Sequence, residues 1–200
     1  MKKARLEAFS DGVIAIIITI MVLELHTPSG TDLASLRPLV PALLSYLLSF
    51  VYVGIYWNNH HHLLHAAREV SGWTLWANMH VLFWLSLFPF AMAWVGQRPT
   101  EAWPTTLYGV VLLMASVAWT LLERALLAHH GPDSALARAI KARRKEWLST
   151  AGYACAIPLA FAAPWASQLV YVVIAAIWFV PDRRIETALA GTMAPGGPPE

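Results

Sequence analysis

The sequence predicts an all-α integral membrane protein with six transmembrane helices per subunit. Hydrophobic residues make up 58% of the 200 residues and charged residues only 13%, whereas about 25% of residues in a soluble domain are charged. The mean hydropathy is +0.52, and several apolar stretches have the length of about 20 residues that a membrane helix needs. This composition leaves no room for a separate soluble domain.

The predicted helices cover residues 4–25, 39–64, 73–95, 108–128, 147–163 and 166–180. The first must begin before Arg5, because a helix capped at Asp11 and ending at Leu25 would span only about 21 Å of a bilayer core about 30 Å thick. We expect it to be retained, since no small-residue cleavage site follows it. The second, third and fourth are long apolar runs, and the second contains the polar segment WNNHHHLLH.

The fifth and sixth helices are divided only by Ala163-Pro164, and Pro158 lies inside the fifth, so a five-helix alternative stays open. The basic residues favour six helices with both termini in the cytoplasm, because cytoplasmic segments are enriched in Lys and Arg. In this arrangement only Arg37 and Arg98 lie on the outer side of the membrane. The cytoplasmic segments hold Lys2, Lys3, Arg5, Arg68, Arg124, Arg138, Lys141, Arg143, Arg144, Lys145, Arg183 and Arg184.

Residues 1–181 are expected to form one transmembrane domain, and residues 182–200 a cytoplasmic tail. The last ten residues, GTMAPGGPPE, are rich in Gly and Pro and are predicted to be disordered. The basic segment RAIKARRK at 138–145 is expected to contact anionic lipid as a topology signal. Cys155 is the single cysteine, which excludes an intrachain disulfide. No nucleic-acid partner is expected.

The start of the first helix carries Arg5, Phe9, Ser10 and Asp11 in the segment RLEAFSDG. An ionisable side chain inside a membrane helix costs about 2.5–3.5 kcal/mol at the helix centre, so such residues usually face protein or water and mark function. Arg5 and Asp11 are six residues apart and lie on different sides of one helix, so each must find partners elsewhere. The second helix offers Trp57, Asn58, Asn59, His60, His61, His62 and His65, and the third offers Asn78 and His80.

Farther along the first helix, Ile16, Thr19 and Leu23 share one face, with Gly12 a turn earlier and Ile20 beside them. Nearly every position here is apolar. Periodicity alone therefore does not decide whether this stripe faces lipid, packs in the core or has a function. His61 and His65 share a face at the spacing of zinc ligands, but no paired carboxylate accompanies them. A polar packing network or interfacial histidines is therefore favoured over a metal site.

The chain resembles the transmembrane protein 175 potassium channels, whose first helix carries an R-x-x-x-F-S-D motif. Arg5, Phe9, Ser10 and Asp11 match this motif fully. The likeness extends over all six predicted helices, to Tyr56-Trp57 and the histidine run of the second and to Asn78 and Pro89-Phe90 of the third.

The resemblance implies a channel modestly selective for potassium over sodium, in which each chain supplies one six-helix unit of a homotetramer. The first helices would line a central pore, with the hydrophobic constriction at Ile16, Leu23 farther along and Thr19 between them. The implied partners are further copies of the chain, the lipid bilayer and permeant potassium ions, without a cofactor. The implied location is the inner, cytoplasmic membrane, and no enzymatic activity follows from the resemblance.

In the mechanism we expect, apolar rings of Ile16 and Leu23 close the pore by dewetting. A ring of Thr19 hydroxyls replaces part of the hydration shell of a passing ion, because the chain has no TVGYG segment and no acidic residue within the stripe. Polar residues at the start of the first helix then hold it in register through His and Asn partners. The predicted network comprises Arg5, Phe9, Ser10, Asp11, Trp57, His61, His62 and Asn78.

The sequence leaves two other classes of protein as alternatives. A secondary or proton-coupled transporter would use Asp11 and the histidines of the second helix as a relay, although no internal repeat supports it. An intramembrane enzyme would hold a metal with His61, His65 and Asp11, but the sequence has no G-x-S-x-G or H-E-x-x-H motif. Near the outer end, Glu24 could concentrate cations, and an interfacial acid without a ligand role is the favoured interpretation.

Overall fold

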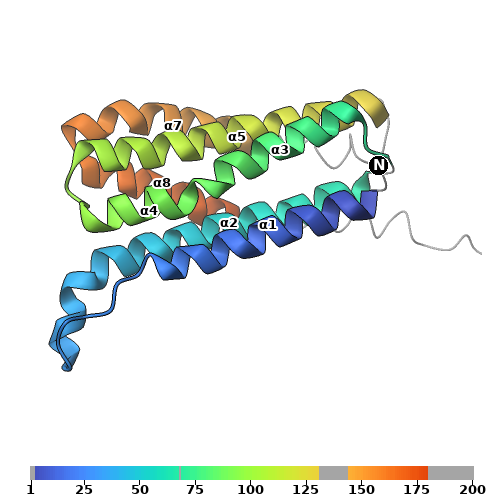
Figure 1. The fold of residues 1–200 in the computed structure, drawn as a ribbon. Coiled ribbons are helices and arrows are strands. Elements are labelled where there is room, and N and C mark those ends of the chain that lie inside the picture. The colour runs from blue at the N-terminus through green and yellow to red at the C-terminus, as the bar shows by residue number, and fades with distance from the viewer. Residues whose placement is uncertain (1–2, 68, 131–143, 180–200) are drawn as a thin grey trace, which may run out of the picture.

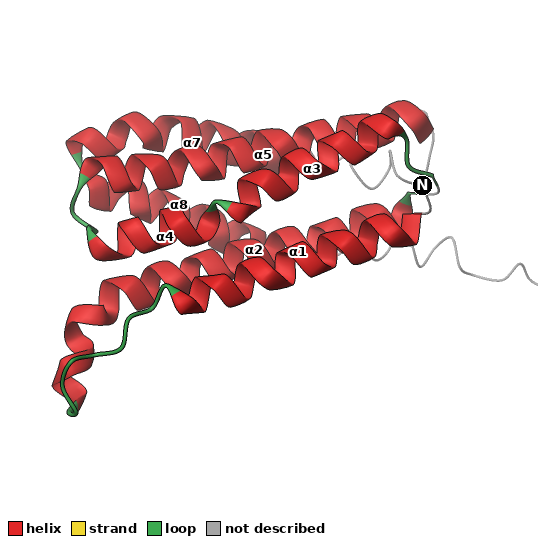
Figure 2. Cartoon of the chain, viewed as in Figure 1, coloured by secondary structure: helices red, strands yellow, loops and turns green. Residues whose placement is uncertain are grey.

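The computed structural model describes residues 3–67, 69–130 and 144–179, and every regular element in these ranges is helical (Figures 1 and 2). The tail predicted at residues 182–200 and most of the basic segment at 138–145 lie outside the described residues. The elements are α1 (Lys3–Leu23), η1 (Leu33–Leu39), α2 (Val40–Ala66), α3 (Gly72–Ser86), α4 (Phe88–Gln97), α5 (Ala102–His130), α7 (Arg144–Ala162) and α8 (Pro164–Phe179).

The helices pack as one elongated bundle (Figure 1). α1 and α2 run antiparallel beside each other, and α1 also contacts α3 and α4. α5 packs mainly against α3 and α7, and α7 packs against α8. η1 and the chain leading to it project beyond the bundle at the end opposite the N-terminus. α1 therefore has neighbours along part of its circumference only.

The described helices fit a multi-pass membrane protein. Four helical stretches are long and apolar enough to cross a bilayer, and α8 is a shorter apolar helix. The long stretches are Lys3–Leu23, Leu33–Ala66, Gly72–Gln97 and Ala102–Ala128. Each contains or overlaps one of the first four predicted helices. The second stretch is longer than predicted because η1 runs directly into α2, with Asp32 accepting a hydrogen bond from the Ser35 amide at 3.1 Å at its start.

The third predicted helix, over residues 73–95, is divided in the structure into α3 and α4. The break falls at Leu87, and Pro89 occupies the first turn of α4. Proline has no amide hydrogen to donate to the carbonyl four residues earlier, and its ring clashes with that carbonyl in a continuous helix. In the first turn of a new helix neither problem arises. Pro89 therefore explains why this crossing consists of two helical segments.

α7 and α8 form an antiparallel pair that turns at Ala163. The Ser167 hydroxyl donates to the Ala156 carbonyl at 2.8 Å, and the Trp178 indole N–H donates to the Ser149 hydroxyl at 2.7 Å. These bonds join positions progressively farther from the turn, as an antiparallel arrangement requires. The division at Ala163-Pro164 was predicted, whereas Pro158 lies inside α7 without ending it.

Candidate functional site

α1 has two faces of different character. One face is buried against the rest of the subunit and carries Leu6, Ser10, Ile14, Ile17 and Met21. The other is open: the exposed fraction is 59% for Ile16 and 77% for Leu23, compared with 2% for Ile14 and 3% for Ile17. The stripe predicted from the sequence thus lies on the side of α1 that faces away from the subunit's core. Periodicity alone did not distinguish these two faces.

The open face of α1 also differs from the exposed face of α8. The exposed residues of α8 are aliphatic or aromatic, among them Leu169, Val172, Val173 and Ile177, as in a lipid-facing helix. The exposed residues of α1 include Arg5, Asp11 and Thr19 among apolar ones. Polar and ionisable groups on a membrane helix usually face protein or water. The open face of α1 is therefore poorly suited to lipid.

Thr19 presents a defined chemistry on this face. Its side chain is exposed, and its hydroxyl donates to the Ile16 carbonyl of the preceding turn at 2.8 Å. A hydroxyl has a single hydrogen to donate and two lone pairs. Because the hydrogen is directed along the helix, the oxygen lone pairs are what Thr19 can offer to a group in front of the face. Such an oxygen suits a cation.

A buried hydrogen-bonded triad fixes α1 to the helices behind it. The Asn78 amide donates through Nδ2 to the Ser10 hydroxyl at 2.9 Å, and Asn78 Oδ1 lies 2.7 Å from His60 Nε2. An amide oxygen only accepts, so His60 Nε2 carries the hydrogen in this assignment. Ser10 and Asn78 are 0% exposed and His60 is 2% exposed. The triad joins α1, α3 and α2 at one level of the bundle.

Asp11 pairs with Trp57, which was among its candidate partners, although His and Asn partners were expected. Its Oδ1 accepts a hydrogen bond from the Trp57 indole N–H at 3.0 Å, rather than from a histidine or asparagine. The Trp57 ring stacks on His61 with ring centroids 6.3 Å apart, and His61 in turn stacks on His65 at 6.1 Å. This second contact between α1 and α2 lies on the exposed side, outside the buried triad.

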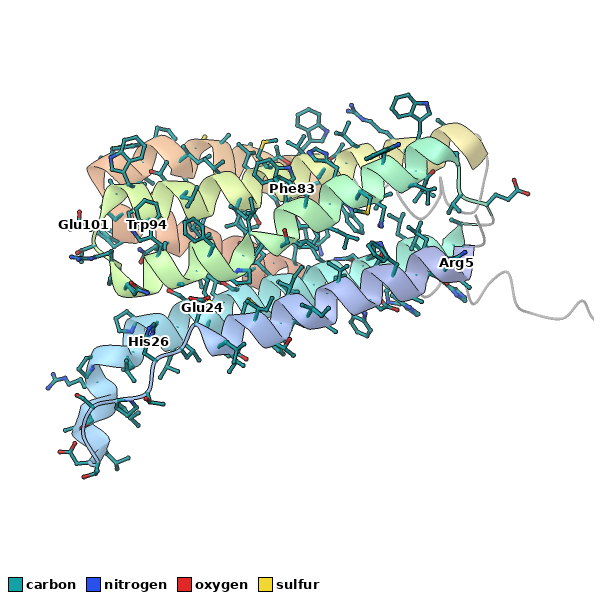
Figure 3. The ribbon with its side chains drawn as sticks, viewed as in Figure 1. Arg5, Glu24, His26, Phe83, Trp94 and Glu101 are labelled. Atoms are coloured by element: carbon teal, nitrogen blue, oxygen red, sulfur yellow. The ribbon has the colours of Figure 1, made fainter. Side chains whose placement is uncertain are left out.

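The other predicted network residues occupy less buried positions. His62 contacts His61 edge to face at 5.7 Å, and Phe9 is 50% exposed. Arg5 is exposed at the end of the bundle opposite Glu24 (Figure 3), and no hydrogen bond or ion pair joins it to another described residue. By helical geometry Arg5 lies only about 20° from Ile16 around the axis. The structure therefore places Arg5 on the open face rather than in the triad.

The predicted network contains His61 and His62 but not His60, which the sequence offered only as one of several candidate partners. The signal was present in the buried pattern of α2, where Val53, His60 and Leu64 follow at intervals of seven and four residues and share one helix face. Among the described residues there is no group of three or more His, Cys, Asp or Glu side chains that could hold a metal ion.

A multi-pass helical bundle with one open, partly polar helix anchored by a buried triad defines a membrane-protein subunit whose first helix faces further protein or water. The family model described as endosomal/lysosomal potassium channel TMEM175 matches residues 5–89, which cover most of α1 and all of α2 and α3. A protein of Chryseobacterium sp. (strain P1-3) named as a potassium channel is 49% identical over 189 residues, covering 94% of this chain and 98% of that protein.

Two further comparisons agree. A potassium channel of Streptomyces collinus is 30% identical over 173 residues, covering 80% of this chain and 83% of that protein. The crystal structure of a lysosomal potassium-selective channel TMEM175 homolog from Chamaesiphon minutus matches with a TM-score of 0.76 at 28% identity, covering 88% of this chain and 95% of that one. The chain belongs to the TMEM175 family. It is accordingly a multi-pass cation channel protein and not an enzyme.

Proposed function

We propose that the chain forms a homotetrameric potassium channel of modest selectivity over sodium, in which the open face of α1 lines a central pore. The observation that carries the proposal is the exposure of Ile16, Thr19 and Leu23 on a helix whose opposite face is buried. A single helix cannot enclose a path for water, whereas several copies of this face arranged around an axis can. The Chryseobacterium and Streptomyces relatives, both named as potassium channels, support potassium as the permeant ion.

The proposed pore has three successive levels. Ile16 and Leu23 form apolar rings about 10 Å apart along the helix axis at 1.5 Å per residue, and these rings close the pore by dewetting. Thr19 lies between them and contributes oxygen lone pairs that replace part of the ion's hydration shell. Arg5 and Glu24 lie toward opposite ends of the face (Figure 3). Permeant potassium is the only ion the mechanism needs, and no cofactor takes part.

The triad and the bond between Asp11 and Trp57 have a supporting role in this proposal. They hold α1 at a fixed rotation, so that its apolar stripe faces the axis. We place the protein in the inner, cytoplasmic membrane with both termini in the cytoplasm, as the distribution of basic residues favours. In that orientation Lys3, which donates to the carbonyls of His65 and Ala67 at 3.2 and 3.1 Å, ties the cytoplasmic ends of α1 and α2 together.

The contacts of Asp11 count against the proton-coupled transporter. A relay passes protons between groups that both accept and donate them. The partner of Asp11 is the Trp57 indole, which only donates. His60, the buried histidine, is bound to Asn78, whose amide does not titrate. The described contacts therefore serve positioning and do not form a continuous relay.

Selectivity should depend on the Thr19 oxygen. Thr19→Val keeps the shape of the side chain and removes the hydroxyl. Because one hydrogen-bond-like contact contributes about 0.5–1.5 kcal/mol, we expect the potassium-to-sodium permeability ratio to fall by about two- to tenfold while potassium flux continues. The measurement is paired potassium and sodium flux in liposomes. Thr19→Ser, which keeps the hydroxyl, is the matched control and should retain the ratio; an unchanged ratio in Thr19→Val would remove Thr19 from the selectivity mechanism.

A further inference from the structure

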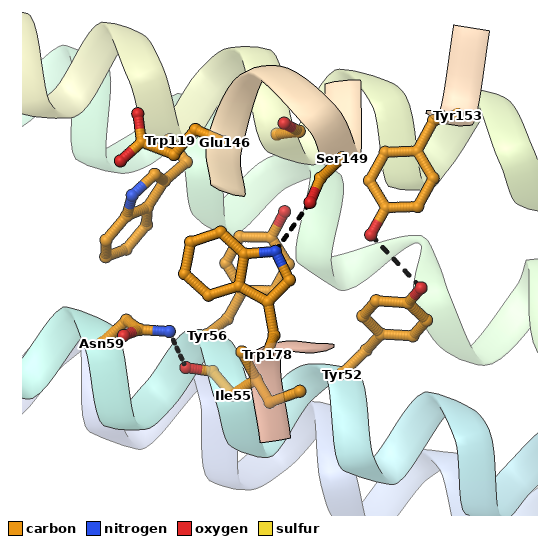
Figure 4. A pocket seen from close by; sticks show the side chains of 10 residues that line it. Tyr52, Ile55, Tyr56, Asn59, Trp119, Glu146, Ser149, Tyr153 and Trp178 are labelled. Atoms are coloured by element: carbon orange, nitrogen blue, oxygen red, sulfur yellow. Dashed lines mark hydrogen bonds between the residues drawn. The ribbon is translucent and has the colours of Figure 1, made fainter. Parts of the chain in front are cut away.

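A cavity of about 40 Å³ lies between α2, α5, α7 and α8, and no residue of α1 lines it (Figure 4). One water needs about 10–15 Å³ on this measure, so the cavity has room for about three waters or a molecule with about three non-hydrogen atoms. It is separate from the proposed pore.

Aromatic rings make up much of the wall. Tyr56 and Trp119 lie edge to face with ring centroids 6.0 Å apart, and Tyr52 and Tyr153 do so at 6.4 Å. Trp178 completes the wall from α8 (Figure 4). The faces of aromatic rings carry partial negative charge and attract cations, with tryptophan the strongest of the three aromatic types. The wall is therefore favourable to a positively charged guest that also has apolar surface.

Most of the hydrogen-bond donors of the wall are already used within the protein. The Trp119 indole N–H donates to Glu123 Oε1 at 2.8 Å, and the Trp178 indole N–H donates to the Ser149 hydroxyl at 2.7 Å. Ser149 itself donates to the Lys145 carbonyl at 2.8 Å. A guest that needed donors, such as an anion, would find few in this part of the wall.

Two of the three tyrosine hydroxyls of the wall, and one N–H of Asn59, follow the same pattern. Tyr153 donates to Tyr52 at 3.2 Å, and Tyr52 donates to the Tyr171 carbonyl at 2.5 Å. Asn59 Nδ2 donates to the Ile55 carbonyl at 2.9 Å, which directs its amide nitrogen back along α2 and leaves its Oδ1 as an acceptor. Glu146 also lines the cavity (Figure 4). Apart from the Tyr56 hydroxyl and the second N–H of Asn59, the wall thus offers mainly aromatic faces and oxygen acceptors.

We propose that this cavity binds a small organic ammonium ion of the size of methylammonium or ethylammonium. An ammonium group donates hydrogen bonds to oxygen acceptors such as Asn59 Oδ1, and its alkyl part and its charge both interact favourably with aromatic faces. A potassium ion fits less well, because hard cations prefer a shell made of oxygen atoms, whereas this wall is largely aromatic carbon. The volume excludes a whole lipid headgroup or a polyamine.

The test uses the full chain, purified in detergent with 5-fluorotryptophan in place of tryptophan, and methylammonium chloride as the probe. The ¹⁹F resonances of Trp119 and Trp178 should shift saturably, with half-saturation in the millimolar range, on the order of 1 mM or weaker for so small a ligand. Resonances of the exposed Trp73 and Trp165 should not shift saturably. Single Trp→Phe variants assign the signals.

Two controls separate binding from a general effect of salt or solvent. Sodium chloride at equal concentration tests for charge alone, and methanol tests for a neutral molecule of the same size. Asn59→Leu should raise the half-saturating concentration about fivefold, the effect of one lost hydrogen bond, and Trp165→Phe should leave it unchanged. The proposal is overturned if the native chain shows no saturable shift, or if methanol or sodium chloride reproduces it, since the cavity then holds only water.

Discussion

Replacing Ile16 with asparagine should raise potassium flux through the protein in liposomes by about tenfold or more. A tenfold change corresponds to only about 1.4 kcal/mol. Fully exposing an isoleucine side chain to water costs about 1.5–3 kcal/mol, and in a tetramer the substitution acts four times around one ring. A polar ring at the constriction removes most of the cost of wetting it. Potassium flux measured with an ion-sensitive dye checks the effect.

Val22→Asn is the matched control for this variant. Val22 is on the same helix and is 48% exposed, close to the 59% of Ile16, but it lies about 120° away around the axis. It introduces the same side chain without changing the proposed constriction. We therefore expect native flux from Val22→Asn, with the same elution volume in size-exclusion chromatography. Equal flux from Ile16→Asn and the native chain would argue against a hydrophobic constriction at this level.

The second large effect is expected from the buried triad. Asn78→Leu removes both hydrogen bonds of Asn78 and leaves the Ser10 hydroxyl and the His60 N–H without that partner in a site that is closed to water. Hydrogen bonds between membrane helices contribute about 0.6 kcal/mol on average and up to about 1.7. We expect the free energy of unfolding to fall by about 1–3 kcal/mol, the thermal midpoint by about 3–10 °C, and flux to fall because α1 loses its fixed rotation.

A rescue variant distinguishes this cause from a packing defect. When every partner is replaced by an apolar group of similar shape, no buried polar atom is left unsatisfied, and the change is much less destabilising. The triple variant Ser10→Ala, His60→Leu, Asn78→Leu should therefore have a higher thermal midpoint than Asn78→Leu alone. A lower midpoint would show that leucine at position 78 is excluded by shape, and that the hydrogen bonds are not what stabilises this contact.

The sequence predicted where the helices lie in the chain better than it predicted whether each helix is continuous or broken. Apolar runs bounded by polar loops are detectable from composition, so the first predicted helix agrees with α1 to within two residues at each end. The break at Leu87 was not predicted, although the sequence shows Pro89 inside the third predicted helix. A proline either kinks a helix or starts a new one, and which occurs depends on the packing of both segments. The structure resolves this through the contacts of α3 with α5 and of α4 with α2.

The site was harder to predict because its residues are chemically alike. Ile14 and Ile16 have the same side chain, and only the packing of α1 against its neighbours makes one buried and the other exposed. Likewise, His60 and His61 are adjacent in a run of three histidines, and the phase of the buried face of α2 selects His60. The motif residues Ser10 and Asp11 were identified from the sequence, whereas their partners required the geometry of three helices.

The central claim, that the open face of α1 lines the ion path, is tested most directly by cysteine accessibility. In a Cys155→Ala background, single cysteines replace Ile16, Thr19 and Leu23 on the open face, Ile14 and Ile17 on the buried face, and Leu169 and Val173 on the exposed face of α8. Silver ion, a thiol-reactive cation small enough to follow potassium, is added during flux. The account predicts block at positions 16, 19 and 23 and continued flux at the other four. Block at 14 and 17, or at 169 and 173 instead, would contradict it.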